Sequence, residues 1–107
     1  LIFGGSQGAR RLNESVPEAL SMLGRNDISV IHQTGAKDVE LVKKAYENYG
    51  IPARVLPFID DMAGSYAEAD FVIARSGAGT VAEITALGKP SLLIPYPFAT
   101  NDHQMAN

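Results

Sequence analysis

The chain has 107 residues, of which 46% are apolar and 20% charged, as expected for one globular domain with a sheet packed between helices. Its formal net charge of −3 argues against a nucleic-acid surface, and the absence of cysteine excludes disulfides, thiolate chemistry and cysteine-based metal sites. The apolar runs are short and broken by proline or glycine, so we expect neither a signal peptide nor a membrane-spanning segment in these residues.

The first half of the chain predicts strands that alternate with helices. A strand over 1–3 leads into a glycine-rich loop over 4–8 and a helix over 9–23. Pro17 lies inside the apolar pattern of this helix, so the helix either kinks there or begins near Ser15 with Pro17 in its first turn. The next predicted elements are a turn over 24–27, a strand over 28–32 and a helix over 38–49 that ends at Gly50.

The second half repeats this alternation around a glycine-rich centre. The predicted elements are a strand over 54–56, a short helix from Asp60–Asp61 to Ala69, a strand over 71–74, a helix that ends before Gly88, and a strand over 91–94. Because the chain begins inside the first strand and ends just after a helix start at Asn101–Asp102, we expect it to be a fragment of a longer protein.

This alternation predicts a parallel sheet with right-handed crossovers and helices on its faces. In such sheets, ligands bind beyond the carboxyl ends of the strands. The loop over 4–8, the segment 57–59, the loop after 74 and the segment 96–107 all follow predicted strands. We therefore expect these four segments to converge on one edge of the sheet and to form a ligand site there.

The stretch from Ala74 to Ile84 gives the clearest indication of a ligand. Gly77 and Gly79 flank one small residue, so the backbone can turn sharply and no bulky side chain shields its N–H groups. A strand precedes these glycines and a helix follows them, and a helix N-terminus offers unpaired N–H donors and a partial positive charge. The stretch therefore predicts an anion site, and we expect a phosphate group there.

Several polar residues also have a purely structural interpretation. The loop over 4–8 lacks the glycine spacing of a dinucleotide fingerprint and the Lys-Ser/Thr pair of a P-loop, so it is either a ligand loop or a tight turn. Thr80 and Glu83 fit a capping box, and Glu83 alternatively accepts hydrogen bonds from sugar hydroxyls. Asp60–Asp61 indicate a helix cap rather than a metal site, and His32 a packed histidine rather than a base.

Four motifs in this order resemble one family of enzymes. They are Gly4-Gly5-Ser6-Gln7-Gly8-Ala9-Arg10, His32-Gln33-Thr34-Gly35, Phe58-Ile59-Asp60-Asp61-Met62 and Arg75-Ser76-Gly77-Ala78-Gly79-Thr80-Val81-Ala82-Glu83, with His103-Gln104 and Asn107 behind them. The family is that of the bacterial peptidoglycan glycosyltransferases, which add N-acetylglucosamine to lipid I to make lipid II. The resemblance covers nearly the whole chain. It implies an α/β fold with a Rossmann-like, doubly wound parallel sheet, the donor-binding half of a GT-B glycosyltransferase.

The resemblance implies that residues 1–107 are a C-terminal UDP-sugar-binding domain, truncated at both ends and without its N-terminal acceptor domain. It also implies how the matched residues bind UDP-N-acetylglucosamine. Ser6 contacts the donor near its phosphates and sugar, and the backbone of Ile59 reads the uracil. The amides of Ala78, Gly79 and Thr80 hold the diphosphate, and the binding segment continues through Val81 and Ala82. Glu83 binds the ribose hydroxyls. Gln104, with Asn107 nearby, faces the N-acetylglucosamine. Family members often carry a bulkier residue where this chain has Gly79, and some carry glutamine where it has His103.

The resemblance implies an inverting transfer, in which an acceptor hydroxyl attacks the anomeric carbon of the sugar and UDP departs. A helix N-terminus rather than a chelated metal ion stabilises the departing charge, which fits the absence of an Asp-x-Asp pair. No catalytic residue, metal ligand or cofactor is implied in this chain, because the general base and the lipid I site belong to the missing domain. We expect the fragment alone to be inactive, and the complete enzyme to contact the cytoplasmic face of the bacterial plasma membrane peripherally.

Other functions fit the same motifs. One is the donor half of another GT-B enzyme, such as the soluble subunit of the eukaryotic dolichol-linked N-acetylglucosamine transferase. Another is a UDP-sugar 2-epimerase of the same architecture, and a third is a nucleotide-binding regulatory module without chemistry. A preceding domain of similar size with its own glycine-rich loop would favour the peptidoglycan enzyme.

Overall fold

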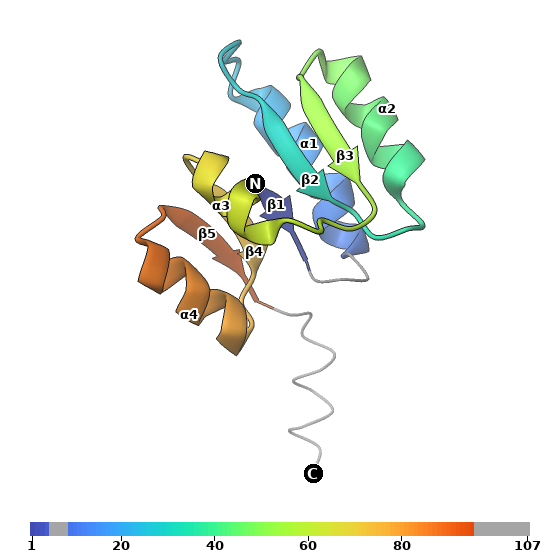
Figure 1. The fold of residues 1–107 in the computed structure, drawn as a ribbon. Coiled ribbons are helices and arrows are strands. Elements are labelled where there is room, and N and C mark those ends of the chain that lie inside the picture. Colours follow the sequence, from blue (N-terminus) through green and yellow to red (C-terminus); the bar gives the residue numbers. More distant parts are fainter. Residues whose placement is uncertain (5–8, 96–107) are drawn as a thin grey trace, which may run out of the picture.

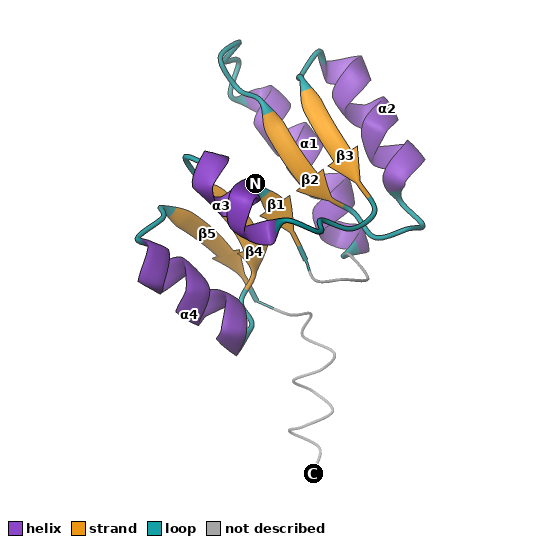
Figure 2. Ribbon diagram, viewed as in Figure 1, coloured by secondary structure: helices purple, strands orange, loops and turns teal. Residues whose placement is uncertain are grey.

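The computed structural model describes residues 1–4 and 9–95 of the chain. Its strands are β1 (Ile2–Phe3), β2 (Val30–Gln33), β3 (Ala53–Leu56), β4 (Val72–Arg75) and β5 (Ser91–Ile94), and its helices are α1 (Arg10–Met22), α2 (Val39–Tyr49), α3 (Met62–Glu68) and α4 (Ala78–Leu87) (Figure 1). Strands and helices alternate along the chain as the sequence predicts (Figure 2). No helix in this part of the chain has both the length and the apolar character that a membrane crossing requires.

The five strands form one parallel sheet in the order β3-β2-β1-β4-β5. The chain winds outward from β1 to β3, returns across the sheet, and winds outward again from β4 to β5. β1 lies in the middle, where Ile2 is paired with His32 of β2 and with Ile73 of β4. This order is that of a doubly wound, Rossmann-like sheet, so the predicted fold class is confirmed.

Two apolar cores lie on opposite faces of the sheet. One contains Ile2 together with apolar residues of the two helices on that face, such as Val16 of α1 and Val42 of α2. The other contains Phe3 and apolar residues of α3, β4 and α4. The ring of Phe3 meets the ring of Tyr66 edge-on, with the ring centroids 5.9 Å apart. Because neighbouring residues of a strand point to opposite faces, each residue of β1 belongs to a different core.

Several boundaries differ by one or two residues from the sequence-based expectations, and the differences in α1 and β2 have a clear cause. α1 begins at Arg10 and contains Pro17 in its interior, so the alternative start near Ser15 is wrong. Pro17 is buried and has no N–H, so the Asn13 carbonyl receives no helical hydrogen bond from it. The second strand is Val30–Gln33 rather than 28–32, because its pairing with β3 begins only at Val30.

Gly4 lies where the end of β1 approaches the start of α1. A Cβ atom at this position would lie 2.6 Å from the Cβ of Ala9 and 3.3 Å from the Ala9 backbone nitrogen. Contacts this short leave no room for a side chain, so the tight connection between strand and helix requires glycine. Residues 5–8 lie outside the described residues, and a ligand role for the rest of this loop stays a prediction.

Replacing Gly4 by alanine should lower the free energy of unfolding by about 1–3 kcal/mol, because the added methyl group overpacks the junction between β1 and α1. Gly79→Ala is the matched control, because its Cβ would meet no atom within 4 Å. That variant should be neutral or slightly stabilising. Urea denaturation of both variants measures the difference, and equal stabilities would contradict the packing role of Gly4.

Candidate functional site

The loops that follow the strands share one edge of the sheet, because all five strands are parallel. β1 and β4 are neighbours at this edge, and the chain winds away from them in opposite directions. Their carboxyl ends are therefore the topological switch point at which doubly wound sheets bind ligands. The two glycine-rich segments follow Phe3 and Arg75, the last residues of these two strands.

α4 begins directly after β4, with its N-terminus at the switch point. Its N-cap is Gly77, whose carbonyl oxygen accepts the N–H of Val81 at 2.9 Å. Thr80 therefore lies inside the first turn, and the predicted capping box of Thr80 and Glu83 is wrong. The sequence pattern pointed to the wrong start because a threonine followed three residues later by glutamate is a stronger cap signal than a glycine.

The first turn of α4 carries backbone donors that no other described residue uses. The N–H groups of Ala78, Gly79 and Thr80 precede the first helical hydrogen bond and have no acceptor within the described part of the chain. The helix dipole adds about half a positive charge at the same end. Ala78 and Gly79 are exposed, and Gly79 has open space in place of a side chain. The start of α4 can therefore hold a phosphate group.

Glu83 lies one turn further along α4 and shares a helix face with Thr80. It is exposed, as are Val81 and Ala82, and it makes no hydrogen bond or ion pair with the described residues. Its charge still acts on Tyr66 of α3. Burial raises the pKa of the Tyr66 phenol, and the Glu83 carboxylate raises it further. Glu83 is therefore an available hydrogen-bond acceptor close to the phosphate-binding end of α4.

The segment after β3 runs past the end of β2 toward α3 (Figure 1). The Ile59 N–H in this segment donates to Oε1 of Gln33 at 2.9 Å. The Ile59 side chain is buried, whereas the neighbouring Phe58 is exposed. The backbone of Ile59, predicted to read a uracil, thus lies at the ligand edge with its donor already satisfied by a side chain of β2.

Two further contacts fix the segments at this edge. Asp61 is the N-cap of α3 and accepts the N–H of Gly64 at 2.9 Å, so the predicted capping role of an acid here is confirmed for Asp61. Arg75 donates to the carbonyl of Pro95 at 2.7 Å and joins the ends of β4 and β5.

Among the described residues, no group of three or more His, Asp or Glu side chains is placed to hold a metal ion.

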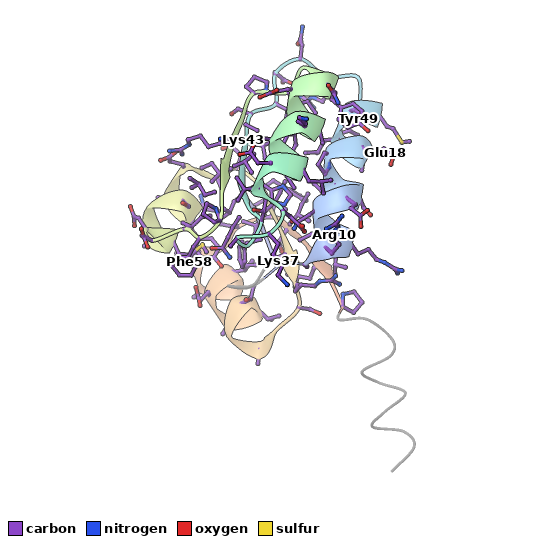
Figure 3. The ribbon with its side chains drawn as sticks, turned by 90° about the vertical axis from the view of Figure 1, so that its right-hand side faces the viewer. Arg10, Glu18, Lys37, Lys43, Tyr49 and Phe58 are labelled. Carbon is purple, nitrogen blue, oxygen red and sulfur yellow. The ribbon has the colours of Figure 1, made fainter. Side chains whose placement is uncertain are left out.

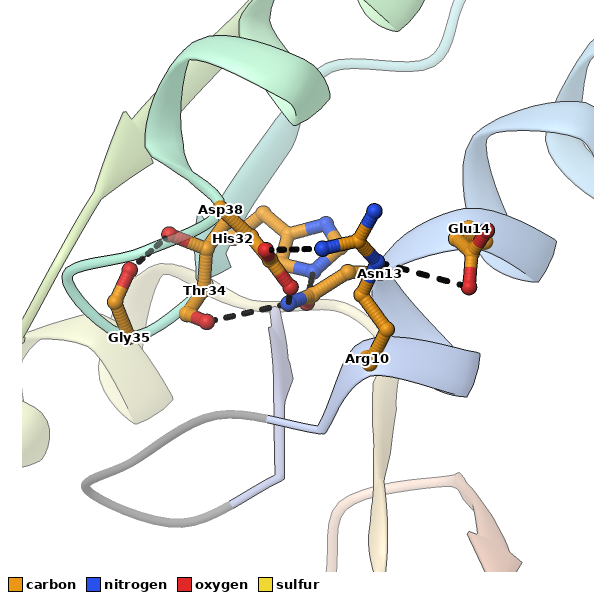
Figure 4. Close-up of polar contacts among 7 residues, drawn as sticks. All are labelled: Arg10, Asn13, Glu14, His32, Thr34, Gly35 and Asp38. Atoms are coloured by element: carbon orange, nitrogen blue, oxygen red, sulfur yellow. Dashed lines mark hydrogen bonds and ion pairs between the residues drawn. The ribbon is translucent and has the colours of Figure 1, made fainter.

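A buried polar network ties α1 to the end of β2 and the start of α2 (Figure 4). The Asn13 amide nitrogen donates to the Thr34 carbonyl at 2.9 Å and to Oδ2 of Asp38 at 2.8 Å. Because both amide protons are used, Asn13 Oδ1 must accept the proton of His32 Nε2, which is 2.9 Å away. The other ring nitrogen, Nδ1, then accepts the hydroxyl proton of Tyr46 at 2.8 Å. One arrangement of protons satisfies every member.

The network extends to the first residue of α1. The Arg10 guanidinium donates to Oδ1 of Asp38 at 2.9 Å, which holds the start of α1 against the N-cap of α2. Arg10 and Lys37 lie on the same side of the molecule, at the ends of these two helices (Figure 3).

Burial lowers the pKa of His32 to about 4, so the imidazole is neutral at pH 7. The prediction of a packed histidine is therefore confirmed.

Sequence reasoning did not find two of the residues that shape this edge, Asn13 and Gln33. The signal for Asn13 was present, because it is buried on the same helix face as Val16 and Pro17. A polar residue within an apolar face indicates a buried hydrogen bond. Gln33 belongs to the motif His32-Gln33-Thr34-Gly35, but nothing in that motif indicated a partner for its side chain, because a polar residue at the end of a strand is ordinarily read as the beginning of a loop.

A cavity of about 870 Å³ lies at the opposite edge, among the amino ends of β1, β2 and β3. Four charged side chains of its lining form two ion pairs, Arg25 with Asp27 and Arg54 with Glu68, and Asp70 also lines it. Doubly wound sheets bind ligands at the carboxyl ends of their strands, so we place the candidate site at the switch point and not in this cavity.

The predicted site residues fall into two groups. The structure brings 78–83 together at the start of α4 and places Ile59 beyond the end of β3. Ser6, Gln104 and Asn107 lie outside the described residues, as does His103, and their roles stay predictions.

The whole chain matches a known family. Residues 1–107 match the model described as glycosyltransferase family 28 C-terminal domain. The chain is 54% identical over 108 residues to the UDP-N-acetylglucosamine--N-acetylmuramyl-(pentapeptide) pyrophosphoryl-undecaprenol N-acetylglucosamine transferase of Halorhodospira halophila. It is 52% identical over 109 residues to the protein of the same name from Trichlorobacter lovleyi. It also resembles the crystal structure of Acinetobacter baumannii MurG, with a TM-score of 0.82 and 41% sequence identity.

The matched relatives are much longer than this chain. The match covers 100% of the chain and 30% of the Halorhodospira protein, and 99% of the chain and 29% of the Trichlorobacter protein. For Acinetobacter baumannii MurG the shares are 98% and 32%. The chain thus spans about 30% of the length of the curated relatives it matches.

The buried network predicts that the chain loses stability in mild acid. The pKa of His32 is about 4 in the folded chain, below its ordinary value of 6.5, so the unfolded chain binds more protons between these values. The contribution of His32 is complete above pH 6.5 and is lost as the pH falls toward 4. The free energy of unfolding should fall by up to about 3 kcal/mol.

The measurement is the free energy of unfolding by urea between pH 7 and pH 5, where few carboxyl groups titrate. His103→Gln is the control that removes the other histidine, and it should keep the pH dependence. Loss of the dependence in His103→Gln, or an imidazole pKa of His32 near 6.5 by NMR, would contradict the assignment.

Proposed function

The chain belongs to the glycosyltransferase family 28 C-terminal domain family, and we propose that it is the donor-binding domain of a peptidoglycan glycosyltransferase. The complete enzyme would transfer N-acetylglucosamine from UDP-N-acetylglucosamine to lipid I, the undecaprenyl-pyrophosphoryl-MurNAc-pentapeptide, and so make lipid II. The observation that carries this proposal is the start of α4, where three unpaired amides lie at the switch point between β1 and β4. The names of relatives about 50% identical to this chain support the proposed substrates.

Each part of the donor has a proposed partner in this domain. The diphosphate binds the amides of Ala78, Gly79 and Thr80, and the ribose hydroxyls bind Glu83. The uracil lies against the backbone of Ile59. Ser6 near the phosphates and sugar, and Gln104 with Asn107 near the N-acetylglucosamine, complete the proposed site.

The proposed chemistry is an inverting substitution at the anomeric carbon of N-acetylglucosamine. The acceptor hydroxyl forms the new carbon–oxygen bond while the bond to the β-phosphate oxygen breaks, and UDP leaves with the bonding electrons. The amides at the start of α4 face the oxygens that gain this negative charge, so they stabilise the transition state more than the ground state. The proton of the acceptor hydroxyl goes to a general base in another domain of the complete enzyme, and lipid I binds there.

The proposal also includes where the complete enzyme works. An acceptor that carries an undecaprenyl chain is anchored in a lipid bilayer, so the complete enzyme must reach the membrane surface. We propose peripheral contact with the cytoplasmic face of the bacterial plasma membrane, made outside the residues of this domain.

The 107-residue chain should bind UDP and UDP-N-acetylglucosamine without transferring the sugar. The dissociation constant should lie in the ~mM range, because one domain alone leaves the cleft open on one side. NMR titration with UDP, with ADP as the matched control, measures binding at the amides of 78–80. An equal response to both nucleotides, or none to UDP, would contradict the proposal.

UDP binding should also persist in EDTA, because the phosphate site consists of backbone amides. Loss of UDP binding in EDTA and its restoration by magnesium would disprove the amide site.

Glu83→Gln should weaken UDP binding on the order of tenfold or more, because it removes a charged acceptor for the ribose hydroxyls. Its free energy of unfolding should change by less than about 0.5 kcal/mol, because Glu83 is exposed and caps no helix. Calorimetry with UDP and with 2′,3′-dideoxy-UDP separates the two effects, and the difference between variant and wild type should vanish for the second ligand.

Glu47→Gln is the control for loss of a carboxylate charge elsewhere, because Glu47 is exposed in the last turn of α2. It should leave UDP binding unchanged. Unchanged UDP affinity in Glu83→Gln would exclude the ribose role.

A further inference from the structure

The peptide between Phe58 and Ile59 is held by one buried side chain. Gln33, at the end of β2, is 2% exposed, and its Oε1 accepts the Ile59 N–H at 2.9 Å. Ile59 is itself 5% exposed, so this hydrogen bond is shielded from water. A buried N–H that loses its acceptor is costly, so this bond strongly favours one orientation of the peptide.

Gln33 lies where the backbone pairing between β2 and β3 ends. The N–H of Thr34 donates to the Leu56 carbonyl at 2.9 Å, and the N–H of Gly35 donates to the Pro57 carbonyl at 3.0 Å. Beyond these two bonds, the chain leaves the sheet and runs toward α3. The bond from Ile59 to Gln33 is therefore the contact that keeps the departing segment over the end of β2.

The same bond determines what this peptide presents to a ligand. No described peptide bond is cis, so the Phe58 carbonyl points away from the Ile59 N–H and hence away from Gln33. A fixed, neutral peptide suits the polar edge of a nucleobase better than a phosphate, which prefers charged groups or a helix N-terminus.

The spacing of the strands fits a nucleotide whose base lies at the 58–59 peptide and whose phosphates lie at the start of α4. The proposed phosphate site follows β4, and the Ile59 segment lies over β2, two strands away in the sheet. Neighbouring strands are about 4.8 Å apart, so the two places are separated by about 10 Å along the edge. A ribose can bridge that gap between a diphosphate and a base.

We propose that Gln33 is a positioning residue for nucleobase recognition, which it controls by fixing the orientation of the 58–59 peptide. The inference rests on the proposed function, because it assumes that a uridine diphosphate binds at this edge. Gln33 itself need not touch the ligand. Its contribution should therefore appear only with ligands that carry a base.

The test compares UDP with ribose 5-diphosphate, which has the same sugar and phosphates but no base. Gln33→Met keeps the length of the side chain and removes the acceptor, so it should weaken UDP binding about three- to tenfold. It should leave the affinity for ribose 5-diphosphate unchanged. Gln33→Glu keeps an acceptor oxygen for the Ile59 N–H and should restore the wild-type ratio of the two affinities, even if the chain is less stable.

Each result bears on one of the two proposals. A similar loss of affinity for both ligands in Gln33→Met would show that Gln33 only supports the fold. Unchanged or tighter UDP binding in this variant would show that the bond from Ile59 to Gln33 does not control base recognition, and would also overturn the inference. Both results leave the proposed function intact if the wild-type chain binds UDP. Failure of the wild-type chain to bind UDP would overturn the proposed function and this inference together.

A measurement on the wild-type chain covers the case in which Gln33→Met does not fold. The Ile59 amide should exchange its hydrogen with solvent more slowly than the exposed amides of Glu40 and Leu41, which precede the first helical hydrogen bond of α2, both before and after UDP is added. Exchange as fast as that of the exposed amides, or loss of protection when UDP binds, would show that Gln33 does not hold the peptide in the binding state.

Discussion

The arrangement of this domain depends on the packing of β1 between β2 and β4. The strand is short, yet Ile2 belongs to the core beneath α1 and α2, and Phe3 belongs to the core beneath α3 and α4. Its hydrogen-bonded neighbours come from the two halves of the chain, which wind in opposite directions. The same placement that joins the two cores therefore creates the switch point, because the chain winds away from β1 and from its neighbour β4 in opposite directions.

The buried polar network gives this edge a defined geometry. Hydrophobic contacts alone hold α1 on the sheet but set its rotation and height only loosely, whereas the three hydrogen bonds of Asn13 require one position. Those bonds reach the end of β2 and the N-cap of α2, so the first turn of α1 and the segment after β2 are fixed relative to each other. The network tolerates burial because every donor and acceptor in it is paired.

Most of the fold could be predicted from the sequence, because the strands and helices carry strong local patterns. Gly50 and Gly88 end their helices in the left-handed conformation, with φ of 69° and 65°, where glycine is favoured. The start of α4 could not be predicted in the same way, since Thr80 and Glu83 form a local pattern that the connection from β4 overrides. The partners of Asn13 and Gln33 could not be identified from local patterns, because each contact joins residues 19 or more positions apart in the sequence.

The charges at the helix starts explain why the candidate phosphate site lies at the switch point. In the part of the chain that the structure describes, four helices follow strands and begin at the carboxyl edge of the sheet. The N-caps of α2 and α3 are Asp38 and Asp61, whose carboxylates would repel an anion at those starts. α1 and α4 have no acidic N-cap and no acidic residue in the first turn. These two helices follow β1 and β4, so the helix starts that can accept an anion are the ones beside the switch point. At α4 the N-cap Gly77 has no side chain to occupy the amides, which leaves them to a ligand.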